Sequence, residues 1–312
     1  MPSHPGAATP VDDFVEVPGG VRLHVRRWAP ARQNDALADF LLVHGLSSNA
    51  RLWDAVSARL VGAGHSATAV DLRSHGESDA PEDGYDTGTA ADDVAHVART
   101  LGMRHAIVAG QSWGGNVVVR LAAEHPDVVA ALALVDGGWS TLSAQYKSWT
   151  SVERRLRPPD IDGRPAASMR AMLRSAHPAW SDEAVDATVA NIAVQPDGTI
   201  RRRLSIPRHM QIVRSMWDDP PSRYYARVHV PVLMMPALPA DPTAAAARRT
   251  RVEQAAAKFA GATVHEYLGG DHDLHAQQPD QVADDLLALA AAVGNDGPRD
   301  DAGGERVLER RD

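Results

Sequence analysis

The sequence contains no cysteine, few aromatic residues and no long apolar run. Without cysteine, the 312-residue chain has no disulfides, no thiolate metal ligands and no cysteine nucleophile. No segment approaches the ~20 consecutive apolar residues that span a bilayer. The first ten residues also lack the basic start and apolar stretch of a secretory signal, so we expect a cytoplasmic protein without membrane contact. The 32 Lys and Arg against 40 Asp and Glu give a net charge of −8, which offers no electrostatic footprint for nucleic acid, so we expect no nucleic-acid partner.

Short apolar runs alternate with helical segments along most of the chain. Val15–Val25 alternates apolar and polar residues around a Pro-Gly-Gly turn and predicts a hairpin. The later runs are Phe40–Val43, Ala67–Val70, Ala106–Ala109, Ala131–Val135, Val232–Met235 and Thr263–Tyr267, and helices are expected at Ala90–Leu101, Gly115–Glu124 and Pro279–Val293. Strands that are apolar throughout and alternate with helices predict a mostly parallel α/β sheet with helices on both faces.

This alternation stops for about ninety residues after Val135. Residues 138–228 contain no convincing strand but hold Trp139, Trp149, Trp180 and Trp217, so we expect a helical insert that forms a lid. The core then comprises residues 13–137 and 229–293. Residues 1–12 and 294–312 are polar or densely charged and are expected to be mobile tails.

The sharpest local motif surrounds Ser112. Gly110-Gln-Ser-Trp-Gly114 follows an apolar run and precedes a helical segment. A Gly-x-Ser-x-Gly sequence at a strand-to-helix junction forms a tight turn that exposes a nucleophilic hydroxyl. The alternative is a serine that caps the helix. We predict that Ser112 is the nucleophile.

Two backbone N–H groups are expected to bind the oxyanion of a tetrahedral intermediate. One is the N–H of Trp113, directly after the nucleophile, and the other is the N–H of Leu46, in the loop after His44 and Gly45. His44 is expected to brace that loop, and Leu46 and Trp113 to shape the substrate pocket.

A general base and an acid are expected from loops at the same edge of the sheet. His272 follows the last apolar run and is the predicted base, with His275 as its competitor. Asp241, 31 residues before His272, is favoured as the acid, and Asp136, 24 residues after Ser112, is the alternative. The two histidines have no third ligand nearby, so we expect no metal site.

Together these residues resemble the α/β-hydrolase superfamily over about residues 15–290. The matching landmarks are His44-Gly45, Asp71–Ser78, the turn at Ser112, and His272 with Pro279 seven positions later. The resemblance implies an eight-stranded, mostly parallel sheet with a helical lid inserted after strand 6. Some members carry the acid after the sixth strand, which keeps Asp136 open. Within the superfamily the chain looks like the capped esterase, lactonase and C–C hydrolase group.

The expected activity is hydrolysis of a carboxylic ester or lactone through a Ser-His-Asp triad and an acyl-enzyme, without metal or organic cofactor. Trp139 and Trp217 with His44, Gly45, Leu46 and Trp113 are expected to line the pocket, which favours a bulky hydrophobic substrate. Alternatives are C–C bond hydrolysis, acyl transfer, or a receptor-like protein with little turnover. A homodimer is left open.

Overall fold

The computed structural model describes residues 9–31 and 37–295. Most of the two expected tails lies outside these residues. The described ends are nevertheless regular, because the first strand begins at Val11 and the last helix ends at Asn295. The expected boundaries at residues 12 and 294 are therefore slightly wrong. Among the described residues, no helix is both long enough and apolar enough to cross a membrane.

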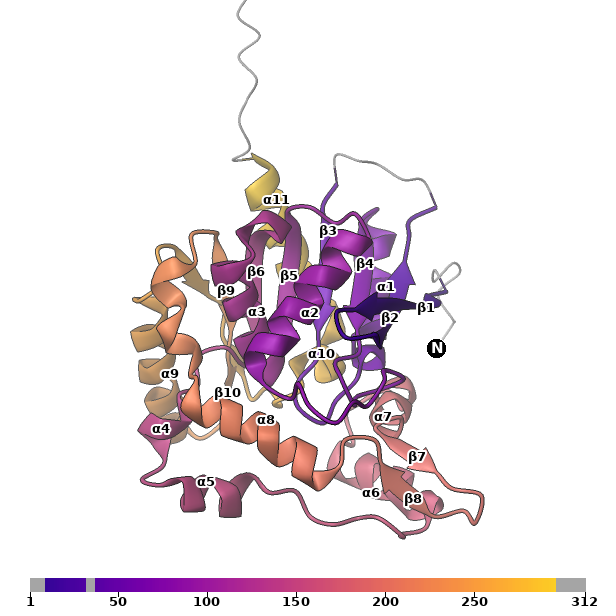
Figure 1. Cartoon of the computed structure of the whole chain (residues 1–312). Helices are drawn as coiled ribbons and strands as arrows, with labels where there is room; N and C mark the ends of the chain where they lie inside the picture. Colours follow the sequence, from indigo (N-terminus) through magenta and orange to yellow (C-terminus); the bar gives the residue numbers. More distant parts are fainter. Residues whose placement is uncertain (1–8, 32–36, 296–312) are drawn as a thin grey trace, which may run out of the picture.

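An eight-stranded sheet forms the centre of the molecule (Figure 1). Its strands, in spatial order, are β1 (Val11–Val17), β2 (Val21–Trp28), β4 (Ser66–Val70), β3 (Asp39–Val43), β5 (Ala106–Gln111), β6 (Val129–Val135), β9 (Val232–Met235) and β11 (Ala262–Val264). β2 runs antiparallel to β1 and β4, and the strands from β4 to β11 run parallel to one another. This confirms the expected eight-stranded, mostly parallel sheet.

Side chains that alternate along each strand build two separate cores. In β3, Leu41 and Val43 pack with α2 (Thr87–Thr100) and α3 (Trp113–Glu124) on one face of the sheet. Phe40 and Leu42 pack with α1 (Asp54–Gly62) and α11 (Pro279–Asn295) on the other face. Because both faces are covered, the central strands are apolar throughout, as their sequences indicated.

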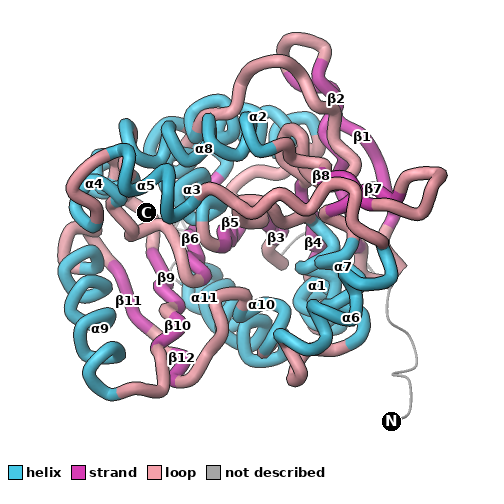
Figure 2. Tube along the Cα trace, turned by 90° about the horizontal axis from the view of Figure 1, so that it is seen from below, coloured by secondary structure: helices cyan, strands magenta, loops and turns pink. Residues whose placement is uncertain are grey.

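The chain between β6 and β9 folds into helices and one small hairpin. The helices are α4 (Leu142–Gln145), α5 (Trp149–Leu156), α6 (Ala166–Ala176), α7 (Asp182–Val189) and α8 (Ile206–Asp218), followed by short 3-10 turns at Pro221–Arg223 and Tyr225–Arg227. The expectation of no strand in this insert is wrong, because β7 (Ile192–Val194) and β8 (Ile200–Arg202) pair antiparallel. In Figures 1 and 2 the insert lies across one edge of the sheet, with α8 and α5 near α4, and α6 and α7 near the hairpin.

Smaller elements complete the region that carries the candidate site. The 3-10 turns Ala50–Trp53 and Pro126–Val128 precede α1 and β6. The expected strand Thr263–Tyr267 divides into β11 and β12 (Tyr267–Leu268), and β12 pairs parallel with β10 (Ala237–Leu238). α9 (Pro242–Ala256) follows β10, and α10 (Leu274–Gln277) precedes α11.

Candidate active site

Ser112 lies in the sharp turn between β5 and α3. Its backbone has φ 52° and ψ −118°, a region that costs about 1–3 kcal/mol for a residue with a side chain. The turn is this tight because β5 and α3 meet directly, and a Cβ at Gly114 would lie only 2.5 Å from the carbonyl oxygen of His44. The Ser112 side chain makes no capping hydrogen bond to α3, so the helix-cap interpretation does not hold. Its hydroxyl is left free for another partner.

That partner is His272, in the loop between β12 and α10. Its Nε2 lies 3.0 Å from Ser112 Oγ, and its Nδ1 lies 2.6 Å from Asp136 Oδ2. The three side chains therefore form one hydrogen-bonded series, with the imidazole between a hydroxyl and a carboxylate. This is the arrangement in which an imidazole can accept a hydroxyl proton while a carboxylate holds its tautomer.

Asp136 is the carboxylate that meets His272, and Asp241 is not. Asp136 follows β6 with φ 43°, and its side chain is 1% exposed. Its Oδ1 accepts hydrogen bonds from the backbone N–H of Ala237 at 2.9 Å and from Arg248 Nη2 at 2.5 Å. Both oxygens of this buried carboxylate are therefore occupied by donors, as a buried charge requires.

The preference for Asp241 is thus corrected by the geometry. Asp241 is exposed and is the N-cap of α9, where its Oδ1 accepts from the backbone N–H of Ala244 at 2.8 Å. A carboxylate at this position satisfies a free N–H of the helix and sits favourably at the helix dipole. Its side chain is engaged in local structure, and no hydrogen bond joins it to His272.

The pKa of His272 is raised above its usual value of 6.5. Partial burial of the ring acts to lower the pKa, but the hydrogen bond and negative charge of Asp136 outweigh it, while the nearby charge of Arg248 opposes them. The side chain of His272 is 53% exposed, so it can exchange protons with solvent or a ligand. A raised pKa means that the neutral, basic imidazole predominates only at a pH above 6.5.

His275, the competing base, is a core residue. It is fully buried, its ring centroid lies 4.5 Å from that of Trp53, and neither ring nitrogen has a hydrogen-bond partner among the described residues. Burial lowers its pKa to about 3. It does not reach Ser112, which leaves His272 as the base candidate. In the part of the chain that the structure describes, no group of three or more His or acidic side chains could hold a metal ion.

The loop after β3 brings Leu46 next to the nucleophile. A Cβ at Gly45 would lie 2.2 Å from Gln111 Oε1 and 3.0 Å from Ser112 Cβ, so a larger residue there would displace the Gln111 side chain and press on Ser112. His44 is fully buried and accepts from the backbone N–H of Leu72 at 3.0 Å, so it braces the loop as expected. Trp113 is the first residue of α3, where a backbone N–H has no acceptor within the helix.

A cavity of about 130 Å³ opens directly at Ser112. It is lined by Leu46, Ser47, Ser48, Leu52, Gln111, Ser112, Thr188, Asn191, His272 and Asp273. Of the residues expected to line the pocket, only Leu46 does so. The lining is largely polar, and the insert contributes Thr188 and Asn191.

The expected aromatic pocket is therefore wrong. Trp113 is buried in the core, where its Nε1 donates to Thr87 Oγ1 at 3.1 Å. Trp217 packs edge-on against Trp149 at a centroid distance of 6.4 Å, in a cluster between α5 and α8. Trp139 borders a separate cavity beside Tyr225. These indoles hold the insert together or attach it to the core, which is the usual role of large apolar side chains.

Several residues support His272 that the sequence did not single out. Gln111 Nε2 donates to the backbone carbonyl of His272 at 3.0 Å, and Asp271 Oδ1 accepts from its N–H at 2.7 Å. Asp271 Oδ2 lies 2.8 Å from His177 Nδ1, so the insert is tied to the loop that carries the base. Asp273 lies in the cavity with its pKa raised by burial. Of these residues, Gln111 alone could have been found from the sequence, because it lies inside the Gly-x-Ser-x-Gly motif.

The sequence of the chain matches a known protein family. The model of the alpha/beta hydrolase family matches residues 40–285. A 2-(acetamidomethylene)succinate hydrolase of Mesorhizobium japonicum is 41% identical over 96 residues, which are 31% of this chain and 34% of that protein. An esterase of Mycobacterium tuberculosis is 43% identical over 97 residues, 31% of this chain and 32% of that protein. The chain thus matches about a third of the length of these curated relatives.

Solved structures share the fold over nearly the whole chain. The crystal structure of E-2-(acetamidomethylene)succinate hydrolase superposes with a TM-score of 0.73 at 24% identity, covering 90% of this chain and 99% of that one. A thioesterase domain from the curacin biosynthetic pathway gives a TM-score of 0.72 at 18% identity, covering 89% and 99%. At these identities the likeness describes the fold alone.

Proposed function

Because the chain belongs to the alpha/beta hydrolase family, we propose that it is a serine hydrolase that cleaves a carboxylic ester or lactone through an acyl-enzyme. The observation that carries the proposal is the hydrogen-bonded series from Ser112 Oγ through His272 to Asp136, with distances of 3.0 and 2.6 Å. The esterase among the relatives supports an ester as the substrate class.

In the proposed reaction Ser112 Oγ attacks the substrate carbonyl while His272 Nε2 accepts the hydroxyl proton. Asp136 keeps the other ring proton on Nδ1, so that Nε2 carries a lone pair, and its charge stabilises the imidazolium that forms. His272 then donates the proton to the leaving alcohol. Water, activated by the same imidazole, hydrolyses the acyl-enzyme and restores Ser112.

The oxyanion is proposed to bind the backbone N–H groups of Leu46 and Trp113. Both residues flank Ser112, one in the loop after β3 and one at the start of α3. In enzymes of this type one such donor is worth about 2.7–4 kcal/mol of transition-state stabilisation. The dipole of α3 adds to the same effect at its N-terminus.

The insert is proposed to act as a lid over the site. It supplies Thr188 and Asn191 to the cavity at Ser112, and the His177–Asp271 contact attaches it to the loop of His272. The cavity is small and largely polar, which argues against the bulky aromatic substrate that the tryptophan content suggested. Esters with short chains fit this lining better.

A fluorophosphonate probe tests the proposal. The probe should label the wild-type protein, and S112A should remain unlabelled although it is folded. Hydrolysis of short-chain para-nitrophenyl esters should disappear in the same variant. Absence of labelling in folded wild-type protein would overturn the serine-hydrolase assignment. Tight ligand binding without turnover would instead favour a receptor.

A further inference from the structure

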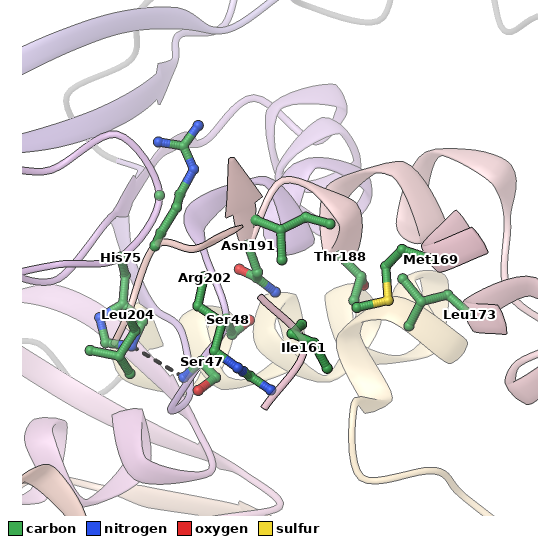
Figure 3. Close-up of a pocket in the computed structure, with 13 residues that line it drawn as sticks. Ser47, Ser48, His75, Ile161, Met169, Leu173, Thr188, Asn191, Arg202 and Leu204 are labelled. Atoms are coloured by element: carbon green, nitrogen blue, oxygen red, sulfur yellow. Dashed lines mark hydrogen bonds between the residues drawn. The ribbon is translucent and has the colours of Figure 1, made fainter. Parts of the chain in front are cut away.

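A second cavity, of about 160 Å³, lies between the insert and the core. Its lining residues are Ser47, Ser48, His75, Gly76, Ile161, Met169, Leu173, Thr188, Asn191, Ile192, Arg202, Arg203 and Leu204. Figure 3 shows His75, Ser47 and Ser48 on one side, Met169 and Leu173 on the other, and Thr188 and Asn191 between them. The volume is far above the ~10–15 Å³ that a single water molecule needs.

This cavity adjoins the one at Ser112. Four residues, namely Ser47, Ser48, Thr188 and Asn191, line both cavities. A ligand whose carbonyl lies at Ser112 can therefore extend past these side chains into the second cavity. The second cavity is therefore placed to receive one end of a ligand that is bound at Ser112.

Arg202, the last residue of β8, lines this second cavity. Its position is set by two hydrogen bonds, from its Nη2 to the carbonyl oxygen of Pro159 at 2.9 Å and from its backbone N–H to Asp162 Oδ1 at 2.9 Å. Its Nε is buried without a hydrogen-bond partner among the described residues. Burial lowers the pKa of Arg202, and the charges of Asp160 and Asp162 only partly offset this effect.

The neighbouring Arg203 differs from Arg202 because its side chain makes an ion pair with a carboxylate. Arg203 Nη2 donates to Glu77 Oε1 at 2.7 Å and its Nε donates to the carbonyl oxygen of Ala190 at 3.0 Å. Within the described part of the chain, Arg202 makes no side-chain ion pair at 4.0 Å or less with any carboxylate. Asp160 and Asp162 lie close enough to act on the pKa of Arg202, but neither forms an ion pair with its guanidinium. A partly desolvated guanidinium without an ion pair has donors that can bind a ligand carboxylate.

We propose that the cavity at Arg202 binds a carboxylate of the substrate, so that the protein prefers esters that carry a second, negatively charged end. The preference rests on the proposed ester hydrolysis at Ser112. Ile161, Met169 and Leu173 would contact the short apolar chain between the two ends. The cavity at Ser112 is lined by the carboxyl group of Asp273 and by no Lys or Arg side chain, so the anionic end of the substrate is oriented toward Arg202.

Two matched substrate pairs test this preference. In the first, the mono-para-nitrophenyl ester of glutaric acid is compared with the neutral ester in which an isopropyl group replaces the free carboxylate. In the second, the acetyl ester of para-hydroxybenzoate is compared with that of para-hydroxybenzamide, which moves the charge to the alcohol side. S112A gives the background rate for each ester.

R202Q should lower kcat/KM for the charged ester of at least one pair by about 10- to 100-fold, the range for hydrogen bonds to charged groups. The neutral esters should change less than about twofold. R201Q is the matched control, because Arg201 is exposed, precedes Arg202 on the same strand and lines neither cavity. Its kinetics should match the wild type for all four esters.

Binding supplies a second measurement that needs no turnover. Monomethyl glutarate should bind S112A by calorimetry, and binding should weaken by a similar factor in S112A/R202Q but not in S112A/R201Q. If R202Q does not fold, R202K retains the charge without the planar fork and should lose part of the preference. If the wild-type protein hydrolyses the neutral esters and shows no preference for the charged ester of either pair, the carboxylate site is overturned and the proposed hydrolysis stands. No turnover of any ester by folded wild-type protein overturns the proposed hydrolysis instead.

Discussion

Replacing Asp136 with Asn changes one atom and should nearly abolish turnover. Oδ1 of Asp136 faces two donors, the N–H of Ala237 at 2.9 Å and Arg248 Nη2 at 2.5 Å. In D136N the amide oxygen will therefore keep that position, and the amide NH₂ group will face His272 Nδ1. Nδ1 must then accept, so the ring proton moves to Nε2, which can no longer accept the proton of Ser112.

The size of the expected loss in kcat follows from two changes, the loss of the productive His272 tautomer and the loss of the negative charge that stabilises the imidazolium. In another Ser-His-Asp enzyme the same substitution lowers kcat by about 10⁴-fold, equivalent to about 5.4 kcal/mol of activation free energy. D241N is the matched control, since Asn is also a good N-cap and the Asp241 side chain accepts its hydrogen bond from the first turn of α9. Its kcat should stay within about twofold of the wild type.

Initial rates with a short-chain para-nitrophenyl ester measure both variants, and circular dichroism melts establish that each is folded. The expected result is a loss of about 10⁴-fold in D136N with D241N unaffected. If folded D136N retains more than about a tenth of the wild-type kcat, the hydrogen bond between Asp136 and His272 is not needed for turnover and the reasoning is refuted. A large loss in D241N would restore Asp241 as the acid.

Three further predictions concern the surroundings of the site. In wild type, kcat/KM should rise with pH through a pKa above 6.5, because His272 must be neutral to accept a proton. The charge of Arg248 lowers the pKa of His272, so R248Q should move the midpoint of this profile to higher pH. R249Q is the control and should leave the midpoint unchanged. His275 has a pKa of about 3 in the folded protein, so the wild-type protein loses stability as pH falls below 6.5 and the unfolded chain takes up a proton. The free energy of unfolding of H275L relative to wild type, measured in urea, should therefore be about 2 kcal/mol more favourable at pH 5 than at pH 7.5. A difference that does not change with pH would contradict this. G114A should lower the Tm by several degrees or prevent folding, because its Cβ would lie 2.5 Å from a carbonyl oxygen; an unchanged Tm would show that the turn relaxes.

Local patterns predicted the elements that carry the nucleophile and the base. The apolar run before Ser112 and the helix after it form β5 and α3, and the loop that contains His272 follows β12. These features are readable because strand and helix periodicity depends on neighbours within a few residues. The hairpin of β7 and β8 was missed because its strands have only three residues each.

Side chains that meet across the fold were harder to predict. Trp113 and Trp217 were assigned to the pocket on residue type alone, yet both pack in apolar clusters away from Ser112. Arg248 carried no motif, and nothing in the run Arg201–Arg203 set Arg202 apart from its neighbours. Their importance depends on which acceptors lie within a few ångströms, and that is set by the packing of α9 on the sheet and of the insert on the core.

The sequence by itself determined the α/β alternation, the elbow at Ser112 and the loop of His272. Only the tertiary structure decided between Asp136 and Asp241. β5 and β6 pair in a register that puts Gln111 opposite Val135, so the next residues, Ser112 and Asp136, lie side by side at the edge of the sheet. The local helix uses Asp241 as its cap. Strand register is a long-range property of the packed sheet, which is why spacing along the chain left both carboxylates open.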